Sequence, residues 1–356
     1  MMRWDDLPQV FSPVGRRLAD ILAEGPRRQD LPGYEPVYRD FVDYIMRCTH
    51  RIWEEKNIGL CRTHYGDDCV MHTLAGPAVG AANVVQGTIG SLGMSSDRQV
   101  IGQDVVWSDD GDDILYSSHR INGQMTHMGD DAMLGPASFR GTGATTIADC
   151  ACSANRIVEE WLVRDNWRAV AQVGGNPWLV AQEQAAADRE GDPTRHGWRA
   201  DAIAAVRAGD DAITANTPAA IPAALLIAAF RDDLFGDAAQ ALSPAAEIRW
   251  PSMRRGAGRG YWIGCATQLR AMLHDVALTI DHAAARPLPH GDIAVAVRWS
   301  LAGRHAGAGA WGPATGHDLL VMAISHYRLR AGIIIDDVTV FDELAVLRQV
   351  AGGLGA

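Results

Sequence analysis

The chain contains almost no lysine and has neither a surplus of basic residues nor a long apolar run. Lys56 is the only lysine, and 43 acids outnumber 32 Lys and Arg residues to give a formal net charge of −11. A nucleic-acid binder or a binder of acidic membranes presents a basic face, so this charge argues against both partners. No stretch approaches the roughly 18 apolar residues of a membrane span. The longest candidate, around 221–230, ends at Arg231.

Signals for export, disulfides and cofactors are also missing. The first residues, MMRWDDLPQVF, carry acids where a signal peptide needs bases and an apolar run, so we expect a cytoplasmic location. The six cysteines are then expected to be thiols, and Cys150-x-Cys152 and Cys69-x-x-His72 lack a second pair at zinc-site spacing. Neither a Gly-x-Ser-x-Gly elbow, a phosphate loop, His-Glu-x-x-His nor a dinucleotide fingerprint occurs. We therefore expect no metal and no cofactor, which leaves acid–base chemistry by side chains.

The order of elements predicts an α+β fold. Residues 1–35 are expected to be an N-terminal arm. Apolar residues at helical spacing from Val37 to Trp53 predict a helix that begins near Pro36. A short strand at 69–73 and a helix at 82–92 follow, and the period of two then predicts long antiparallel strands at 99–108, 113–127, 145–153 and 157–163. Helices followed by a strand meander are typical of an α+β domain, here residues 36–175.

The same order of elements begins again after residues 176–220, which we expect to be a linker with a helix at 178–189. With an offset of 178, Arg120 aligns with Arg298 and His127 with His305. With an offset of 177, Gly135-Pro136-Ala137 aligns with Gly312-Pro313-Ala314 and the acid pair Glu159-Glu160 with Asp336-Asp337. Matches in one order with one small gap indicate an internal duplication, whose second copy spans residues 221–352.

Each copy resembles the SnoaL-like polyketide cyclase family of the NTF2-like (cystatin-like) superfamily. Three stretches carry the resemblance: the histidine-glycine loop that ends in Gly-Pro-Ala, the closing strand Asn155-Arg156-Ile157-Val158-Glu159-Glu160-Trp161, and the segment from Asp165 to Gln172. The second copy loses the tryptophan of the closing strand. The resemblance implies two tandem cone-shaped domains, each with N-terminal helices packed on a curved antiparallel sheet around a pocket. It also implies that the two copies pair through their sheets as an intramolecular pseudo-dimer, with a homodimer of the whole chain as a further alternative.

Strand parity indicates which residues share the pocket. In copy two the alternate residues Val295, Val297 and Trp299 form an apolar face, and the same face in copy one contains His119 and His127. An imidazole titrates near neutral pH, so either histidine could act as a general acid or base. For His127, which both copies keep, the equal alternative is a structural histidine that holds the Gly-Pro turn.

The remaining candidates follow from the resemblance and from position. The resemblance implies an acid–base aspartate on the strand that contains Asp149, whose counterpart is His326 in copy two. A carboxylate in an apolar cone would have a raised pKa and could shuttle a proton. His72 ends the first strand of copy one, where we place Trp250 in copy two, and is read either as a pocket-rim or as a packing residue. Further substrate-binding candidates are Trp107, Tyr116, His305 and His326.

These observations predict a cofactor-independent SnoaL-like enzyme. His127, Asp149 and His119 would transfer protons beside the carbonyl of a small hydrophobic substrate, for intramolecular aldol-type cyclisation or a related isomerisation. One alternative is a binding module of the same fold that holds a small molecule without converting it. Another is a hydrolase or lyase of small metabolites, which would need an arginine between two acids on the pocket face.

Overall fold

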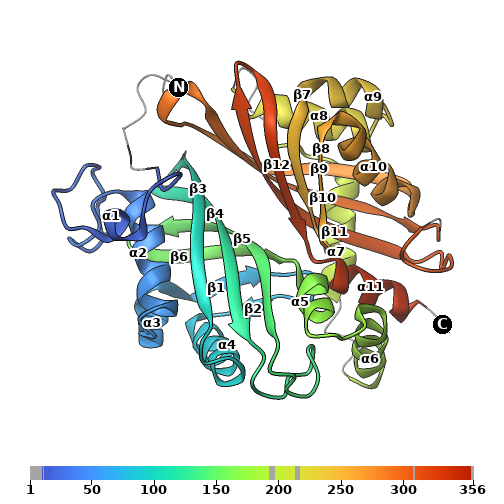
Figure 1. Cartoon of the computed structure of the whole chain (residues 1–356), viewed down its shortest axis with the longest axis horizontal. Coiled ribbons are helices and arrows are strands. Elements are labelled where there is room, and N and C mark those ends of the chain that lie inside the picture. Colours follow the sequence, from blue (N-terminus) through green and yellow to red (C-terminus); the bar gives the residue numbers. More distant parts are fainter. Residues whose placement is uncertain (1–9, 11, 192–196, 213–216, 308, 354–356) are drawn as a thin grey trace.

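The computed structural model describes residues 10, 12–191, 197–212, 217–307 and 309–353 and contains two six-stranded sheets (Figure 1). The strand order is β2-β1-β6-β5-β4-β3 in the first sheet and β8-β7-β12-β11-β10-β9 in the second. The two orders are identical once the numbering is shifted by six. The predicted α+β class and its two tandem units are therefore confirmed. Residues 1–9 and residue 11 of the predicted arm lie outside the described residues.

Unit one contains the first sheet and its helices. A short helix, α1 (Leu18–Leu22), precedes it, and α6 (Pro177–Glu190) and α7 (Gly197–Ala208) follow it. The helices of unit one are α2 (Phe41–Trp53), α3 (Cys61–His64), α4 (Ala81–Met94) and α5 (Asn166–Gln172). Its strands are β1 (Tyr65–His72), β2 (Ala78–Val79), β3 (Gln99–Gly111), β4 (Ile114–Thr126), β5 (Gly141–Ser153) and β6 (Arg156–Arg164).

Unit two repeats this series. Its helices are α8 (Ala220–Phe230), α9 (Phe235–Ala238), α10 (Gly258–Ala271) and α11 (Glu343–Gly352). Its strands are β7 (Leu242–Trp250), β8 (Arg254–Ala257), β9 (Leu273–Pro287), β10 (Ile293–His305), β11 (Asp318–Arg330) and β12 (Ile333–Phe341). The strands and helices that the sequence predicted all occur, most of them a few residues longer.

The sheet register supports the duplication residue by residue. Ser118 on β4 pairs with Asp149 on β5, and Ala296 on β10 pairs with His326 on β11. These pairs are related by offsets of 178 on the first strand and 177 on the second, as the sequence alignment required. The single deletion therefore lies in the loop between the two strands. Asp149 and His326 are structural equivalents.

Two expectations about the elements need correction. Each sheet is mixed rather than antiparallel, because β1 runs parallel to β6 and β7 runs parallel to β12. Helix α2 begins at Phe41, not near Pro36, because the side chain of Asp40 accepts a hydrogen bond from the backbone N–H of Asp43 and caps the helix there. Val37 lies outside the helix and is 47% exposed.

The segment predicted as a linker contains two helices where the sequence indicated one. Helix α6 packs against α11 of unit two, and α7 packs against β9, β10 and β11. Helix α7 thus covers one face of the second sheet, behind the strands in Figure 1. The residues that join α7 to its neighbours, 192–196 and 213–216, lie outside the described residues.

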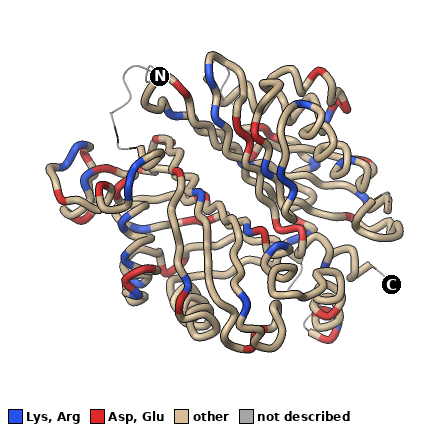
Figure 2. The backbone as a smooth tube through the Cα atoms, viewed as in Figure 1, with Lys and Arg blue, Asp and Glu red and all other residues tan. Residues whose placement is uncertain are grey.

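The two faces of each sheet have different partners. We call the face of the first sheet that packs on α2 its inner face, which contains Val105, Trp107, Ala148 and Cys150. The opposite, outer face meets the outer face of the second sheet, where Val106 packs against Ala284, Ala294 and Ala296. Charged residues of both signs lie along this seam between the units (Figure 2). Both faces of the central strands are therefore buried.

The inner face of unit two is filled by large apolar side chains. Trp299 is fully buried and stacks on Phe230 of α8, with 5.5 Å between ring centroids. The equivalent position in unit one holds the smaller Ile121, which is half-buried. The two units therefore share a fold but differ in how completely their inner faces are packed.

Candidate functional site

The duplicated histidines hold the same loop in the same way. His127 Nδ1 lies 3.1 Å from Ser138 Oγ, and its backbone N–H donates to the carbonyl of Arg140. His305 repeats both contacts with Thr315 Oγ1, at 3.1 Å, and with the carbonyl of His317. Both imidazoles are buried, and burial lowers the pKa of His305. These contacts favour the structural interpretation of His127 and His305.

His119 lies on the inner face but far from His127. It pairs with Val105 and Ala148, which belong to the core against α2. Eight residues separate the two histidines along one extended chain, which corresponds to roughly 26 Å at about 3.3 Å per residue. One small substrate cannot touch both. Burial lowers the pKa of His119 to about 3, so its imidazole is neutral at physiological pH.

We expected Asp149 to lie in the inner cavity of unit one, but the structure places it elsewhere. It pairs with Ser118 and Trp161 on the outer face, because its position on β5 is one residue out of phase with the inner residue Ala148. Its carboxylate accepts a hydrogen bond from Tyr116 and lies 3.7 Å from Arg298 Nε of unit two. Asp149 is 1% exposed. Asp149, which we expected to transfer a proton in the inner cavity, is therefore part of a buried cluster of charged side chains between the units.

Tyr116 and His326 also belong to the seam. The ring of Tyr116 stacks on His282 of β9 with 3.5 Å between centroids. His326 Nε2 lies 2.9 Å from Ser118 Oγ, and its Nδ1 lies 3.8 Å from Asp104 Oδ2. Both side chains connect the two sheets rather than line an inner pocket.

Trp107 is a core residue of unit one. It contacts Phe41 of α2 edge to face, and the guanidinium of Arg286 from unit two lies 3.8 Å from its ring centroid. Trp107 is 2% exposed. It therefore packs between α2 and unit two.

His72 lies at the end of β1 on the outer face. It pairs with Trp161, while Arg249 pairs with Val338, the equivalent of Trp161. The counterpart of His72 is therefore Arg249 and not Trp250, because the strand alignment keeps the offset of 177. His72 Nε2 lies 2.8 Å from Glu159 Oε1, and its ring stacks on Trp161.

The inner face of unit one contains a carboxyl group that the sequence analysis did not assign to a site. Glu160 pairs with Cys150 on the inner face and is 6% exposed. Burial raises its pKa to about 7, against the opposing effects of Arg164 and of a hydrogen bond with Tyr65. Burial likewise raises the pKa of its equivalent in unit two, Asp337, to about 7. The aligned acid pairs within apolar strands were the sequence signal for these groups.

The surroundings of the two carboxyl groups differ. Asp337 accepts hydrogen bonds from Trp250 Nε1 at 3.0 Å and from Thr339 Oγ1 at 2.7 Å, inside a filled core. Around Glu160 the inner-face side chains are half-buried: Tyr65, Ile121, Leu162 and Arg164. Their equivalents in unit two are at most 2% exposed: Leu242, Trp299, Thr339 and Phe341. The inner face is therefore less completely buried in unit one than in unit two.

Two arginines give this inner face positive charge. Arg164 follows Glu160 by four residues on β6 and is half-buried. Arg98, just before β3, has its pKa lowered to about 10 by burial and by the charge of Arg164. A carboxyl group poised near neutral pH, a phenol and a cation are a set that can remove a proton and stabilise the resulting oxyanion. We take Glu160, Tyr65 and Arg164 as the candidate site.

The described part of the chain can be searched for disulfides, metal sites and membrane-spanning helices. All six cysteines are buried and free, as predicted. Within the described residues, no three His, Cys, Asp or Glu side chains lie close enough together to hold a metal ion. None of the helices described is both long and apolar enough to cross a membrane.

No protein-family model matches the sequence, and no curated protein matches it either. Several solved structures are similar. They include IdmH from Streptomyces antibioticus, named as a proposed polyketide cyclase, at 22% identity and a TM-score of 0.32, with 37% of this chain and 97% of IdmH covered. A proposed SnoaL-like polyketide cyclase from Jannaschia sp. CCS1 matches at 17% identity and a TM-score of 0.32, covering 39% of this chain and 98% of that protein.

An NTF2-like protein of unknown function from Exiguobacterium sp. 255-15 is similar at 19% identity and a TM-score of 0.28. It covers 36% of this chain, and 99% of its own length is matched. Two of these solved structures thus carry the names SnoaL-like and NTF2-like, which are those of the families that the sequence resembles.

Proposed function

We propose that the inner face of unit one catalyses cofactor-independent proton transfer at a carbon next to a carbonyl, in a small hydrophobic substrate. The products would be those of an intramolecular aldol-type cyclisation or of a related isomerisation. The observation that carries the proposal is Glu160, a buried carboxyl whose pKa is raised to about 7 on the inner face whose surrounding side chains are only half-buried. A base poised near the working pH is the most effective one.

Each residue of the candidate site has a chemical role. The carboxylate of Glu160 takes the proton from the carbon, the electron pair of the C–H bond forms the C=C bond of an enolate, and the π pair of the carbonyl moves to its oxygen. Tyr65, whose pKa burial raises well above its usual value, stays protonated and is a hydrogen-bond donor to Glu160 or to that oxygen. Arg164 supplies positive charge where negative charge develops. The enolate carbon then attacks a second carbonyl, and protonated Glu160 returns its proton to the new alkoxide.

Unit two is expected not to catalyse the reaction. Asp337 has the same position and a similarly raised pKa, but Trp250 and Thr339 already occupy its oxygens. Trp299 fills the space that Ile121 leaves in unit one. The second unit therefore provides a natural comparison for the first.

The proposal is tested by hydrogen–deuterium exchange at the α-carbon of 1-tetralone, an apolar ketone, followed by NMR in D2O with the full chain. We expect the wild-type protein to accelerate exchange and the rate to rise with pH through about 7, as Glu160 ionises. Glu160→Gln is expected to reduce the acceleration by about 10²- to 10⁴-fold, the usual contribution of a general base.

The matched control is Asp337→Asn, which removes the equivalent carboxyl from the filled unit and should leave exchange unchanged. Equal losses in both variants would point to a structural role of the buried acids. Unchanged exchange in Glu160→Gln would leave the binding of a small molecule without turnover as the better function for this inner face.

A further inference from the structure

A second pocket lies between the units, on the outer faces of the sheets. It has a volume of about 770 Å³, within the usual range for small-molecule sites. Its floor is the outer face of β9, β10 and β11, and α7 forms its roof. Trp161 and His72 of unit one close one side. Three chain segments that are distant in sequence thus build one pocket, and none of the residues of the candidate site on the inner face lines it.

The walls of this interunit pocket are mostly apolar and aromatic. Met322 and Leu320 lie on the floor, the indole of Trp161 comes from β6 of unit one, and the indole of Trp198 comes from α7. Both indoles are half-buried, so part of their surface remains accessible. An indole face attracts cations as well as apolar groups. The pocket therefore suits a ligand with an apolar body.

Acidic side chains outnumber basic ones among the polar residues that line the pocket. Among the described residues that line it, Arg298 is the only arginine, and three are aspartates: Asp201, Asp210 and Asp281. The Arg298 guanidinium lies 3.6 Å from the ring centroid of Trp161 and 3.7 Å from Asp149, and it interacts with Asp281 as well. One guanidinium is thus shared by two carboxylates. Burial and the nearby charges of Asp149 and Asp211 raise the pKa of Asp281, against the opposing effects of Arg298 and of the hydrogen bond from Ser300.

Asp281 is placed in the pocket by a β-bulge. On β9, Ile280 pairs with Trp299 and His282 pairs with Arg298, so Asp281 is the extra residue without a partner on β10. A bulge of this kind redirects a side chain. Asp281 accepts a hydrogen bond from Ser300 Oγ at 2.7 Å, which holds its carboxylate beside Arg298.

The equivalent region of unit one lacks these features. The bulge is repeated on β3, between Gly102 and Asp104, but its extra residue is Gln103, which is exposed. Helix α7 packs on three strands of the second sheet, β9, β10 and β11. Asp281, helix α7 and the indoles of Trp161 and Trp198 therefore occur together only on this side of the duplicated fold. The packing of the fold alone does not require them.

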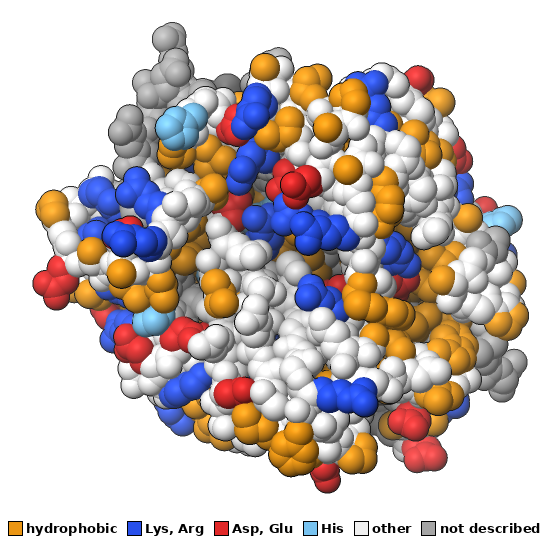
Figure 3. Space-filling view, viewed as in Figure 1, with side chains coloured by type: hydrophobic (Ala, Val, Ile, Leu, Met, Phe, Trp, Pro, Cys, Tyr) orange, Lys and Arg blue, Asp and Glu red, His pale blue; other side chains and the backbone are white. Residues whose placement is uncertain are grey.

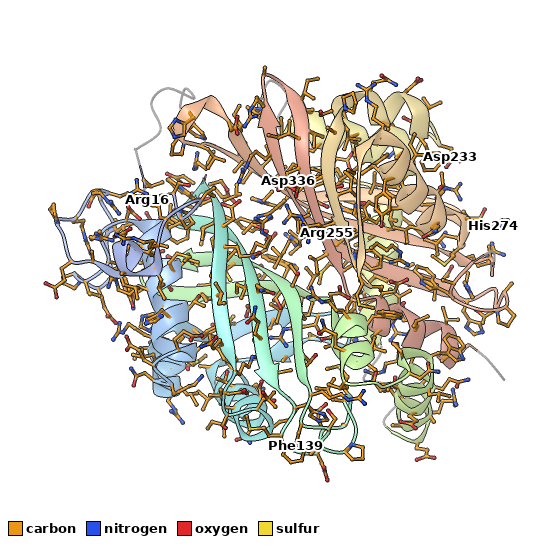
Figure 4. The ribbon with its side chains drawn as sticks, viewed as in Figure 1. Arg16, Phe139, Asp233, Arg255, His274 and Asp336 are labelled. Atoms are coloured by element: carbon orange, nitrogen blue, oxygen red, sulfur yellow. The ribbon has the colours of Figure 1, made fainter. Side chains whose placement is uncertain are left out.

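The seam itself is visible from the outside. Basic side chains, Lys or Arg, gather in the middle of the face shown in Figure 3, where the units meet. Figure 4 places Arg255 and Asp336 of unit two on the side nearest unit one. Charged side chains of both signs thus lie along the seam.

We propose that the interunit pocket binds a small amine with an apolar, aromatic body, whose ammonium group pairs with Asp281 while its body packs against Trp161, Trp198 and Met322. Asp149 and Asp281 share the single positive charge of Arg298, and the ammonium group of the ligand would supply a second one. The same surroundings disfavour an anionic ligand, which would add a third negative charge.

The test uses the full chain and three probes of one shape: 2-(1-naphthyl)ethylamine, 2-(1-naphthyl)ethanol and 3-(1-naphthyl)propanoate. We expect isothermal titration to show the amine binding at least about tenfold more tightly than the alcohol, the gain of one charge-assisted contact, and the propanoate binding most weakly. Asp281→Asn should abolish the preference for the amine over the alcohol.

Asp275→Asn is the matched control, because Asp275 is an exposed acid of the same strand, paired with Arg304 outside the pocket. It should keep the preference. A second variant, Ala205→Phe, fills the pocket from α7 and should weaken the amine and the alcohol alike. Absence of amine binding, equal binding of amine and alcohol, tighter binding of the propanoate, or a preference that survives Asp281→Asn would each overturn the proposal. None of these outcomes depends on exchange at the inner face.

Discussion

At the scale of single residues, the strongest contrast in the molecule is between Glu160 and Asp149. The sequence assigned chemistry to Asp149 because a resemblance placed an acid on its strand. It treated Glu160 only as one half of an aligned acid pair. A shift of one position on a strand exchanges the two faces of a sheet, so no residue-type argument can separate the two acids without the register. The register required the pairing of Ala148 with His119, which only the structure supplies.

Glu160 also makes stability depend on pH in a defined direction. Its pKa is raised from 4.5 to about 7 on folding, so the native state holds the proton more tightly than the unfolded state. Its contribution to the free energy of unfolding is therefore fully present below about pH 4.5 and is lost as pH rises through 7. Asp337, with a pKa of about 7, acts in the same direction.

The variant Glu160→Gln isolates this effect, since glutamine mimics the protonated acid at every pH. We expect the stability of the variant relative to the wild type to be greater at pH 8 than at pH 5, in urea denaturation at both values. A difference that is constant with pH would mean that Glu160 is ionised at both, and would also remove the basis for its proposed role as a base near neutral pH.

At the scale of elements, the ends of the last helices connect the units reciprocally. Asp165 caps α5 by accepting from the N–H of Arg168, and it also accepts from the N–H of Ser252 in unit two. Its equivalent, Asp342, caps α11 and accepts a hydrogen bond at 2.6 Å from Asn166 Nδ2 of unit one. The capping role was readable from the sequence, because an acid precedes an apolar helix in both copies. The contacts between the units were not, since nothing local encodes them.

Replacing Asp165 by alanine should therefore cost more than a simple cap. We expect a loss of about 1–3 kcal/mol in the free energy of unfolding, from the cap and from the buried N–H of Ser252 that loses its partner. Asp165→Asn should lose less, because its amide oxygen can still accept. Urea denaturation measures the free energy of unfolding of both variants, and Asp232→Ala, at an exposed position, is the reference. Equal stability of the alanine and asparagine variants would show that the oxygen at this position accepts no stabilising hydrogen bond.

Other elements show where prediction from sequence succeeds. The long strands with period-two patterns were found, and their alignment by two offsets agrees with the register of β4, β5, β10 and β11. Helix α7 was missed, because Ala, Asp and Arg give it little local signal and it is ordered by packing on the outer face of the second sheet. Since α7 roofs the interunit pocket, the pocket was missed with it.

At the scale of the whole molecule, duplication has produced an interior that belongs to neither unit. The outer faces carry apolar residues at the centre, Val106 against Ala284, Ala294 and Ala296, and polar bridges such as Ser118 to His326 beside them. An isolated unit would expose this outer face. Strand parity accordingly predicted one apolar face for each sheet, with Arg298 on the opposite face. In the folded chain Arg298 is only 9% exposed. Both faces are interior, and the second interior is created by the pairing of the units.

This arrangement predicts that the two units unfold together. Ala296 is 3% exposed at the centre of the seam, so Ala296→Arg would force a charge without a partner between the sheets, at a cost of about 3–5 kcal/mol. We expect a single transition for the wild type in urea, and for the variant an earlier transition that separates the units from each other before each unfolds. Ile333→Arg, at a position of unit two that is 39% exposed, should behave as the wild type. A single transition with an unchanged midpoint in Ala296→Arg would mean that the units are stable without each other, and that the seam, with its pocket, is a contact between two independent domains.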